Sequence, residues 1–320
     1  MLRSMRRLKS SQISSQKRAG QGCPAYGTWG RGGDATPTRP GGMTVLGVGG
    51  AGMPSLRDLG ECEMKIYILT DLEGAAMVSR FSQTREEGPQ KQTAMKLLTW
   101  EINAAIDGIL DVDADAEVVV WDGHGNGGID VLEFHPKGKL IARGPIRAPY
   151  YLDETYDALF FVGQHAMAGT PNAPLSHTYS SLSIEYYKLN GNEIGEFGCR
   201  AAMAGTFNVP TVFISGDDKA VTEAKQLIPN IYGVETKQGL GQELALHLSP
   251  ERSRELIRET AAEACRNIAQ IEPVTIKPPY RFEVRVLEGK SIEGYLKRGA
   301  QKIDDRTVVI YSDDICELSI

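Results

Sequence analysis

From Met64 onward, short apolar runs rich in β-branched residues alternate with longer stretches of helical spacing. Four runs have the length and composition of buried strands: KIYILT (65–70), EVVVW (117–121), ALFFVG (158–163) and TVFIS (211–215). The helical spacing recurs over residues 93–110, 197–207, 218–228 and 250–269. This alternation predicts an α/β fold with a mostly parallel sheet covered by helices.

Local signals support this division of the chain. The helical stretch at 218–228 opens with Asp, and the one at 250–269 opens at Ser-Pro-Glu (249–251), as capped helices do. Residues 181–195 hold Asn-Gly between two strand-like arms and predict a hairpin. From about Glu272 the pattern changes to KPPYRFEVRVLEG and RTVVIYS, which predicts a smaller α+β C-terminal part.

The composition excludes several classes of protein. Of 320 residues, 41% are hydrophobic, so the chain as a whole is not disordered. No apolar run reaches the length of a membrane span, and we expect no membrane partner. Asp and Glu total 41 against 35 Lys and Arg, which disfavours binding to nucleic acid. The five cysteines are scattered and never form C-x-x-C, so we expect a cytoplasmic protein.

Residues 1–63 differ from the remainder. They are basic at the start, rich in Ser and then in Gly, Pro and Thr, a composition that cannot build a core. We therefore expect a disordered N-terminal extension over 1–63 and a folded domain over 64–320. The alternatives are a targeting segment and a translation start at Met64.

The extension contains one motif that is typical of dinucleotide-binding proteins. Gly47, Gly49 and Gly52 match G-x-G-x-x-G, and Asp71 lies at about the distance of a ribose-binding acid. The motif needs a full strand before it and a helix after it. Here the preceding run is only MTVL and the following segment is short, with Gly60 inside it. We therefore disfavour dinucleotide binding.

Each of three predicted strands is followed by side chains that can bind a metal ion. YILT is followed by Asp71 and Glu73, VVVW by Asp122 and His124, and LFFVG by His165. Because ligands of open α/β sheets bind beyond the carboxyl ends of the strands, we expect these side chains to lie together. Two of the chain's five histidines stand here, which capping alone does not explain.

Carboxylates and imidazoles form a mixed oxygen and nitrogen ligand set. Such a set suits zinc or, less selectively, manganese or iron. Asp71 and Glu73 are separated by one residue, so both face the same side if the chain is extended. One carboxylate can then bridge two ions, and paired ions are used to activate water. The pattern therefore predicts hydrolytic chemistry.

The other histidines and one glutamate are less informative by themselves. Glu196 stands at a predicted helix start, where the helix dipole favours glutamate in any case. His177 lies on a Pro-rich loop, and either residue could complete the site. We assign His135, which precedes a proline, and His247, at the end of a predicted helix, to structural roles.

Three aspartates stand close to the predicted site. Asp217 and Asp218 follow the strand TVFIS, where they either line the cleft or cap the helix that begins there. Asp122 directly precedes the Gly-His pair at 123–124. We expect these three aspartates to support the ligands rather than to bind metal.

Six short motifs follow one another along the chain: D-L-E-G (71–74), W-D-G-H (121–124), G-Q-H-A (163–166), L-S-H-T (175–178), G-E-F-G (195–198) and S-G-D-D (215–218). In these motifs and their order the chain resembles the bacterial zinc-dependent D-aminopeptidases, including those encoded alongside dipeptide transport systems. The resemblance covers essentially Met64 to Ile320. One such four-residue motif would support the resemblance only weakly, whereas six in the same order are specific to the family.

The resemblance implies an aminopeptidase that acts on short peptides or amides with an N-terminal D-amino acid. It implies two zinc ions per subunit held by five ligands, with Asp71 as the bridge, Glu73 and His124 on one ion, and His165 and Glu196 on the other. His177 matches the family's catalytic histidine, a nucleophile or general base. The family also forms closed homo-oligomeric rings, which implies the same assembly here.

Two alternatives remain open from the sequence. The same ligands would serve an amidase or aminopeptidase for L- or β-amino-acid substrates, because stereochemical preference depends on the shape of the pocket. A protein of another class, which binds metal without catalysis, would also keep them. The presence of His177 beside the full ligand set argues against that second alternative.

Overall fold

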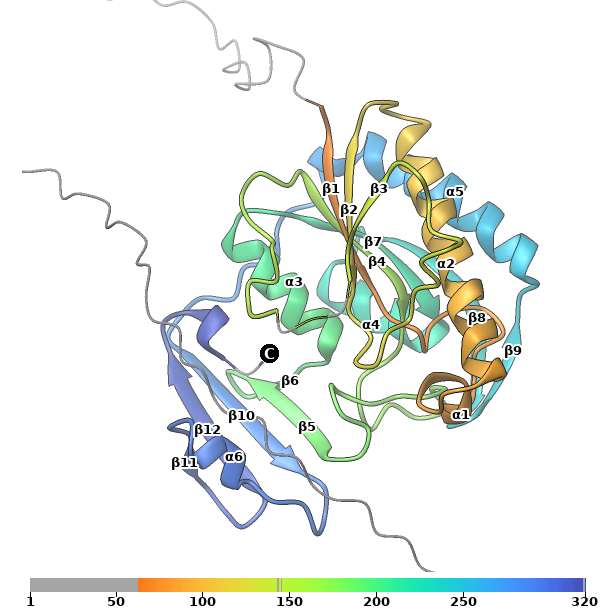
Figure 1. Cartoon of the computed structure of the whole chain (residues 1–320). Helices are drawn as coiled ribbons and strands as arrows, with labels where there is room; N and C mark the ends of the chain where they lie inside the picture. Colours follow the sequence, from red (N-terminus) through yellow and green to blue (C-terminus); the bar gives the residue numbers. More distant parts are fainter. Residues whose placement is uncertain (1–62, 143, 145, 319) are drawn as a thin grey trace, which may run out of the picture. The chain divides into compact units, whose positions relative to one another are not determined.

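The main sheet, sheet A, confirms the predicted α/β class. The computed structural model describes residues 63–142, 144, 146–318 and 320. Sheet A has seven strands in the order β3-β2-β1-β4-β7-β8-β9 (Figure 1). They are β1 (Lys65–Thr70), β2 (Glu117–Asp122), β3 (Gly138–Ile141), β4 (Ala158–Gln164), β7 (Thr211–Asp217), β8 (Tyr232–Gly241) and β9 (Leu244–His247). Neighbouring strands are parallel except β8 and β9.

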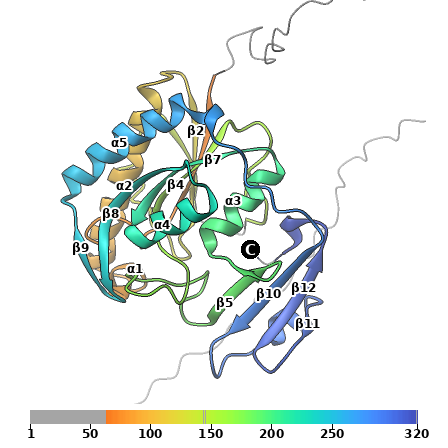
Figure 2. The same ribbon diagram turned by 180° about the vertical axis from the view of Figure 1, so that it is seen from behind.

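Helices cover both faces of sheet A. The two long helices, α2 (Pro89–Leu110) and α5 (Pro250–Arg266), pack against each other on one face, and α3 (Glu196–Thr206) and α4 (Asp218–Leu227) lie on the other (Figures 1 and 2). A short helix, α1 (Phe81–Thr84), precedes α2. The central strand β4 is buried at every residue because both faces are covered.

The predicted helix starts are confirmed at α4 and α5. The side chain of Asp217 accepts hydrogen bonds from the backbone N–H groups of Lys219 and Ala220. At α5 the side chain of Ser249 accepts from the N–H of Arg252 at 3.2 Å, and Pro250 occupies the first helical position. Each cap satisfies backbone donors that have no partner inside the helix.

A second sheet, sheet B, has five antiparallel strands in the order β11-β12-β10-β5-β6. They are β5 (Ile184–Leu189), β6 (Asn192–Glu193), β10 (Tyr280–Val286), β11 (Gln301–Lys302) and β12 (Thr307–Ser312), with helix α6 (Glu293–Leu296) nearby. The predicted hairpin is β5–β6. Asn190 and Gly191 at its turn have φ of 51° and 87°, the left-handed conformation that a type I′ turn requires.

Sheet B shows that the C-terminal part does not stand alone. Strand β10 pairs with β12 on one side and with β5 of the hairpin on the other. Tyr187 on β5 packs edge-on against Phe282 on β10, with ring centroids 4.9 Å apart. The sequence predicted the hairpin and the C-terminal strands separately, because pairing between distant segments leaves no local signal.

Several further expectations can be placed against the described residues. The predicted extension over 1–63, apart from Glu63, and the G-x-G-x-x-G motif lie outside them. Within the described part of the chain, no helix has the length and apolar character needed to cross a membrane. Cys199, Cys265 and Cys316 are free thiols.

Candidate metal centre

Strands β1, β2 and β4 end level with one another. Thr70 at the end of β1 pairs with Asp122 of β2 and with Val162 of β4. The residues that follow these strands therefore meet at one edge of sheet A, as ligand sites of open α/β sheets do. The structure brings together the four strand-end residues that are predicted ligands: Asp71, Glu73, His124 and His165.

The carboxylate of Asp71 lies between two histidines. Its Oδ1 atom is 3.0 Å from Nδ1 of His124, and its Oδ2 atom is 3.0 Å from Nε2 of His165. The backbone N–H of Leu72 donates to Oδ1 at 2.8 Å and holds the carboxylate in place. The two oxygens thus face two different histidines, the arrangement of a carboxylate shared by a pair of metal ions.

Two groups of possible ligands surround Asp71. The first comprises Asp71, Glu73 and His124, and the second comprises His165, His177 and Glu196. Within each group the ligand atoms lie within 4.8 Å of one another. The two groups therefore have the composition of two adjacent metal sites with oxygen and nitrogen ligands.

Helix α3 contributes Glu196 from its first residue. The Oε1 atom of Glu196 lies 3.4 Å from Nε2 of His165 and 3.9 Å from Nε2 of His177. It also accepts the backbone N–H of Tyr179 at 2.6 Å. The rings of His165 and His177 stack with centroids 3.9 Å apart. His177 therefore belongs to the second group and is in contact with the predicted ligands.

Each of the three histidines is oriented by a backbone carbonyl. Nε2 of His124 lies 3.1 Å from the carbonyl of Thr84, and Nδ1 of His165 lies 2.9 Å from that of Ala166. Nδ1 of His177 lies 2.8 Å from the carbonyl of Leu175. A ring nitrogen that faces a carbonyl carries a proton, so the opposite nitrogen is the one that faces the site and would bind a metal ion once deprotonated.

The site contains buried ligand atoms without hydrogen bonds. Among the described residues, Oε2 of Glu73 and Nε2 of His165 have no hydrogen-bond partner of suitable geometry, although each has an ion-pair neighbour about 3 Å away. Buried polar atoms are rarely left in this state. Their orientation toward a shared space fits atoms that coordinate a metal ion.

Charges in the site perturb one another strongly. Burial alone would lower the pKa of His124, but Glu73 and Asp71 outweigh it and raise that pKa to about 11. Burial opposes ionisation of Glu196 as well, yet the neighbouring histidines lower its pKa to about 2. The carboxylate of Glu196 is therefore ionised and compensated by positive charge, the role that metal ions take in such clusters.

A buried lysine supports the loop that carries Asp71 and Glu73. Lys237 on β8 donates from Nζ to three backbone carbonyls of this loop, those of Glu73, Ala75 and Val78. Burial lowers its pKa to about 8. On the same loop, the N–H of Ala76 donates to Glu101 of α2 at 3.0 Å. No sequence motif predicted this support.

Replacing Lys237 with methionine should destabilise the protein. The substitution removes the lysine donor from three carbonyls, of which, within the described part of the chain, only that of Ala75 keeps a backbone donor, the N–H of Val78 at 3.2 Å. We therefore expect the free energy of unfolding to fall by roughly 3 kcal/mol in denaturant titrations of the metal-free protein. Lys139→Met is the matched control, because Lys139 is exposed and, among the described residues, pairs only with Glu117 at 2.8 Å. It should change stability by less than about 0.5 kcal/mol. Equal stability of the two variants would contradict this role of Lys237.

The three aspartates that were predicted to support the ligands have different positions. Asp122 accepts the N–H of Gly128 at 2.9 Å, in the loop that carries His124. Asp217 caps α4 and accepts the N–H of Ala166, next to His165, at 3.2 Å. Asp218 instead accepts the N–H of Gly239 on β8. Asp122 and Asp217 thus lie behind the ligands, whereas Asp218 tethers α4 to β8 and does not border the cavity described next.

A cavity of ≈ 340 Å³ opens onto the ligands. Besides Asp71, Glu73, His124, His177 and Glu196, its lining includes residues that sequence reasoning missed: Arg85, Asn126, Tyr179, Ser180, Ser181, Leu182 and Arg200. Of these residues, only Arg200 could have been predicted from the sequence. It stands four residues after Glu196 on a predicted helix, so its side chain lies on the same helix face as that of Glu196.

The remaining two histidines lie away from the ligand groups. His135 pairs with Asp107 at 3.4 Å, near a turn as predicted. His247 accepts the N–H of Met77 at 2.9 Å. The prediction that His247 ends a helix is wrong, because Leu244–His247 form the edge strand β9, whose pairing with β8 is a tertiary contact.

Comparisons with known proteins agree with this geometry. A family model, Peptidase_M55, described as D-aminopeptidase, matches residues 64–319. The chain is similar to a D-aminopeptidase of Bacillus subtilis (strain 168), with 30% identity over 221 residues, 68% of this chain and 79% of the relative. Among solved structures it is similar to the Zn-dependent D-aminopeptidase DppA from Bacillus subtilis, a self-compartmentalizing protease. That match has a TM-score of 0.75 and 28% identity, and it covers 79% of this chain and 93% of DppA.

Proposed function

The chain belongs to the Peptidase_M55 family of D-aminopeptidases, and from this membership we propose that it is a dinuclear zinc enzyme that hydrolyses short peptides or amides beginning with a D-amino acid. Family membership and the likeness to DppA make it a hydrolase of the metallo-aminopeptidase class. We assign the catalytic unit to residues 64–320.

The position of Asp71 carries the two-metal proposal. Its two oxygens face histidines of different ligand groups at 3.0 Å each. We assign Glu73 and His124 to one zinc ion, His165 and Glu196 to the other, and Asp71 to both. When bound, the ions would supply Lewis acidity, which polarises a carbonyl and makes water more acidic. The mixed imidazole and carboxylate set suits zinc.

We assign the proton transfer to His177. Its Nδ1 faces the Leu175 carbonyl, so Nε2 is free to accept a proton. Burial and the neighbouring His165 lower the pKa of His177 below its usual value, which favours the neutral imidazole. As general base, Nε2 takes a proton from the attacking water and returns one to the leaving amine. One water is consumed, and the D-amino acid and the shortened peptide or amine are released.

Assembly and location extend the proposal. DppA is a self-compartmentalizing protease, and we propose that this chain likewise forms a closed homo-oligomeric ring. A sedimentation mass of a single chain would contradict the ring. We also propose a cytoplasmic location, in keeping with the free thiols of Cys199, Cys265 and Cys316.

Hydrolysis of D-Ala-D-Ala and L-Ala-L-Ala, measured side by side with zinc supplied, tests the proposed function. We expect a strong preference for the D-peptide. Cleavage of the L-peptide alone would keep the ligands but place the protein among metal aminopeptidases for L-amino acids. If a folded, metal-loaded sample cleaves neither peptide, the proposed peptidase function is contradicted, and another amide substrate or a binding role is favoured.

A chain that begins at Met64 separates the contribution of the N-terminal extension. We expect it to retain the D-peptide activity, because every proposed ligand lies within 64–320. Unchanged activity together with the absence of nucleotide binding would also exclude the dinucleotide interpretation of the motif at Gly47–Gly52. A loss of activity would contradict the assignment of the catalytic unit.

A further inference from the structure

Arg200 lines the cavity of the candidate metal centre from helix α3. It stands four residues after Glu196, so both side chains project from the same face of the helix. Both residues border the cavity of ≈ 340 Å³. Arg200 is therefore placed to contact whatever molecule occupies the cavity beside the ligand groups.

Three aromatic rings surround the guanidinium group of Arg200. Its Cζ atom lies 3.9 Å from the ring centroid of Tyr150, 5.2 Å from that of Trp121 and 5.3 Å from that of Tyr179. Trp121 and Tyr150 stack on each other at 4.5 Å with planes 13° apart. Contacts of this kind hold a cation in a defined orientation without neutralising its charge.

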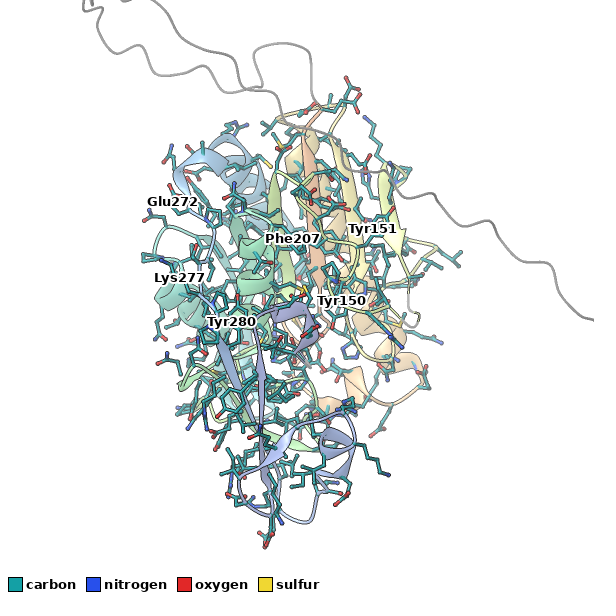
Figure 3. All side chains as sticks on the ribbon, turned by 90° about the vertical axis from the view of Figure 1, so that its left-hand side faces the viewer. Tyr150, Tyr151, Phe207, Glu272, Lys277 and Tyr280 are labelled. Atoms are coloured by element: carbon teal, nitrogen blue, oxygen red, sulfur yellow. The ribbon has the colours of Figure 1, made fainter. Side chains whose placement is uncertain are left out.

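Of the three aromatic rings around Arg200, that of Tyr150 is held in position by hydrogen bonds. The carbonyl of Tyr150, labelled in Figure 3, accepts a hydrogen bond from the hydroxyl of Tyr67 at 2.6 Å. The hydroxyl of Tyr150 donates to the carbonyl of Ile320 at 2.6 Å. Because both ends of Tyr150 are fixed, the guanidinium of Arg200 has little freedom to turn away from the cavity.

Arg200 lacks an acidic partner among the described residues. No carboxylate of these residues lies within 4.0 Å of it, and its Nη1 atom is buried without a hydrogen-bond partner. Other arginines of the chain, such as Arg258 and Arg306, pair with Asp111 and Glu185 at 2.7 Å. Arg200 is partly buried, and burying a guanidinium nitrogen without an anion is costly, so an anionic ligand is the expected partner.

The charge of the cavity favours an anion at the same place. The three carboxylates that border it, those of Asp71, Glu73 and Glu196, all belong to the ligand groups. Once they hold metal ions, their negative charge is compensated. Arg200 and Arg85 then leave the remaining part of the cavity positive. Arg85 already donates to the hydroxyl of Ser181 and lies over the ring of Phe81, whereas Nη1 of Arg200 has no such partner.

We propose that Arg200 binds the C-terminal carboxylate of a dipeptide substrate and so makes the enzyme selective for short peptides with a free carboxylate. This proposal rests on the proposed peptidase function. A dipeptide carries its carboxylate one residue beyond the scissile bond, and a cavity of ≈ 340 Å³ lies at the small end of the range for ligand pockets. Arginine is well suited to this contact because its planar donors match a carboxylate.

A pair of substrates that differ only at the C-terminus tests the proposal. D-Ala-D-Ala and its C-terminal amide are hydrolysed by the zinc-loaded full chain, and kcat/KM is compared. We expect the wild type to prefer the free carboxylate by about 10- to 100-fold, the effect of one charged hydrogen-bonded contact. Arg200→Gln should bring this preference below about 3-fold, and Arg200→Lys should keep part of it, because lysine retains the charge but not the fork.

A binding measurement gives a second readout that does not depend on turnover. The probe is D-Ala-D-Ala with its peptide carbonyl reduced to CH2, which cannot be hydrolysed, together with the C-terminal amide of the same compound. Calorimetric titration should show the same carboxylate preference in the wild type and its loss in Arg200→Gln. Metal content and melting temperature of each variant show whether the site and the fold are intact.

Two further variants make the outcome specific. Arg258→Gln, at an exposed ion pair on α5, is the matched control and should retain the full preference. Arg85→Gln removes the other arginine of the cavity. If Arg85→Gln rather than Arg200→Gln abolishes the preference, or if Arg200→Gln weakens peptide and amide alike, the proposal is overturned. If the wild type hydrolyses neither substrate, the proposed peptidase function fails, and the binding comparison still decides the role of Arg200.

Discussion

Replacing Asp71 with alanine should remove both metal ions and nearly all peptidase activity. Asp71 is the only described residue whose two carboxylate oxygens lie 3.0 Å from histidines of both ligand groups. Without it, neither group keeps its shared ligand. We expect kcat/KM for D-Ala-D-Ala to fall by about 10³-fold or more, since metal ions supply the main charge stabilisation in such sites.

The metal content of the variants distinguishes a bridge from an ordinary ligand. After dialysis against buffer with trace zinc, Asp71→Ala should retain no bound ion by elemental analysis. Glu73→Gln is the matched comparison, because Glu73 contacts only the first group through His124 at 3.1 Å. It should retain about one ion per chain. One ion retained by Asp71→Ala, with normal melting of the fold, would exclude a bridging role.

Replacing His177 with alanine should remove turnover while the metal ions stay bound. The five assigned ligands are unchanged in this variant, and only the proposed proton acceptor is lost. We expect kcat for D-Ala-D-Ala to fall by about 10²- to 10⁴-fold, the range for removal of a general base. Steady-state kinetics and elemental analysis of the same preparation measure both properties.

The position of His177 also allows a different outcome. Its Nε2 lies 3.9 Å from Glu196, within the second group of possible ligands. Loss of one ion from His177→Ala would identify it as a ligand, and normal turnover would remove it from the mechanism. His135→Ala is the control, because His135 pairs with Asp107 far from both groups and should leave metal content and kcat unchanged.

Much of the fold was predictable because its signals are local. The strands that became β1, β2, β4 and β7 are short apolar runs, and the caps at Asp217 and Ser249 are signalled by adjacent residues. Strand β9 and the pairing of β5 with β10 were not predictable in this way. Both depend on contacts between segments far apart in the sequence, which leave no period or turn signal.

The candidate site divides in the same manner. Asp71, Glu73, His124 and His165 could be proposed together because parallel strands present their carboxyl ends at one edge of the sheet. Glu196 and His177 were weaker candidates, since a helix-start glutamate and a loop histidine are common without any function, and only the resemblance to D-aminopeptidases implied their roles. The structure places both residues at the site, with Glu196 3.4 Å from His165.

The sequence by itself determined the family, the mostly parallel α/β sheet and the order of the proposed ligands, because each of these depends on short motifs or patterns of neighbouring residues. Only the tertiary structure decided which nitrogen of each histidine faces the site, that Lys237 holds the loop after β1, and that Arg200 lies among aromatic rings with no acidic partner in the described part of the chain. These features depend on the direction of individual side chains and on partners from distant elements. Burial, hydrogen bonding and charge act between such partners only once the chain has folded.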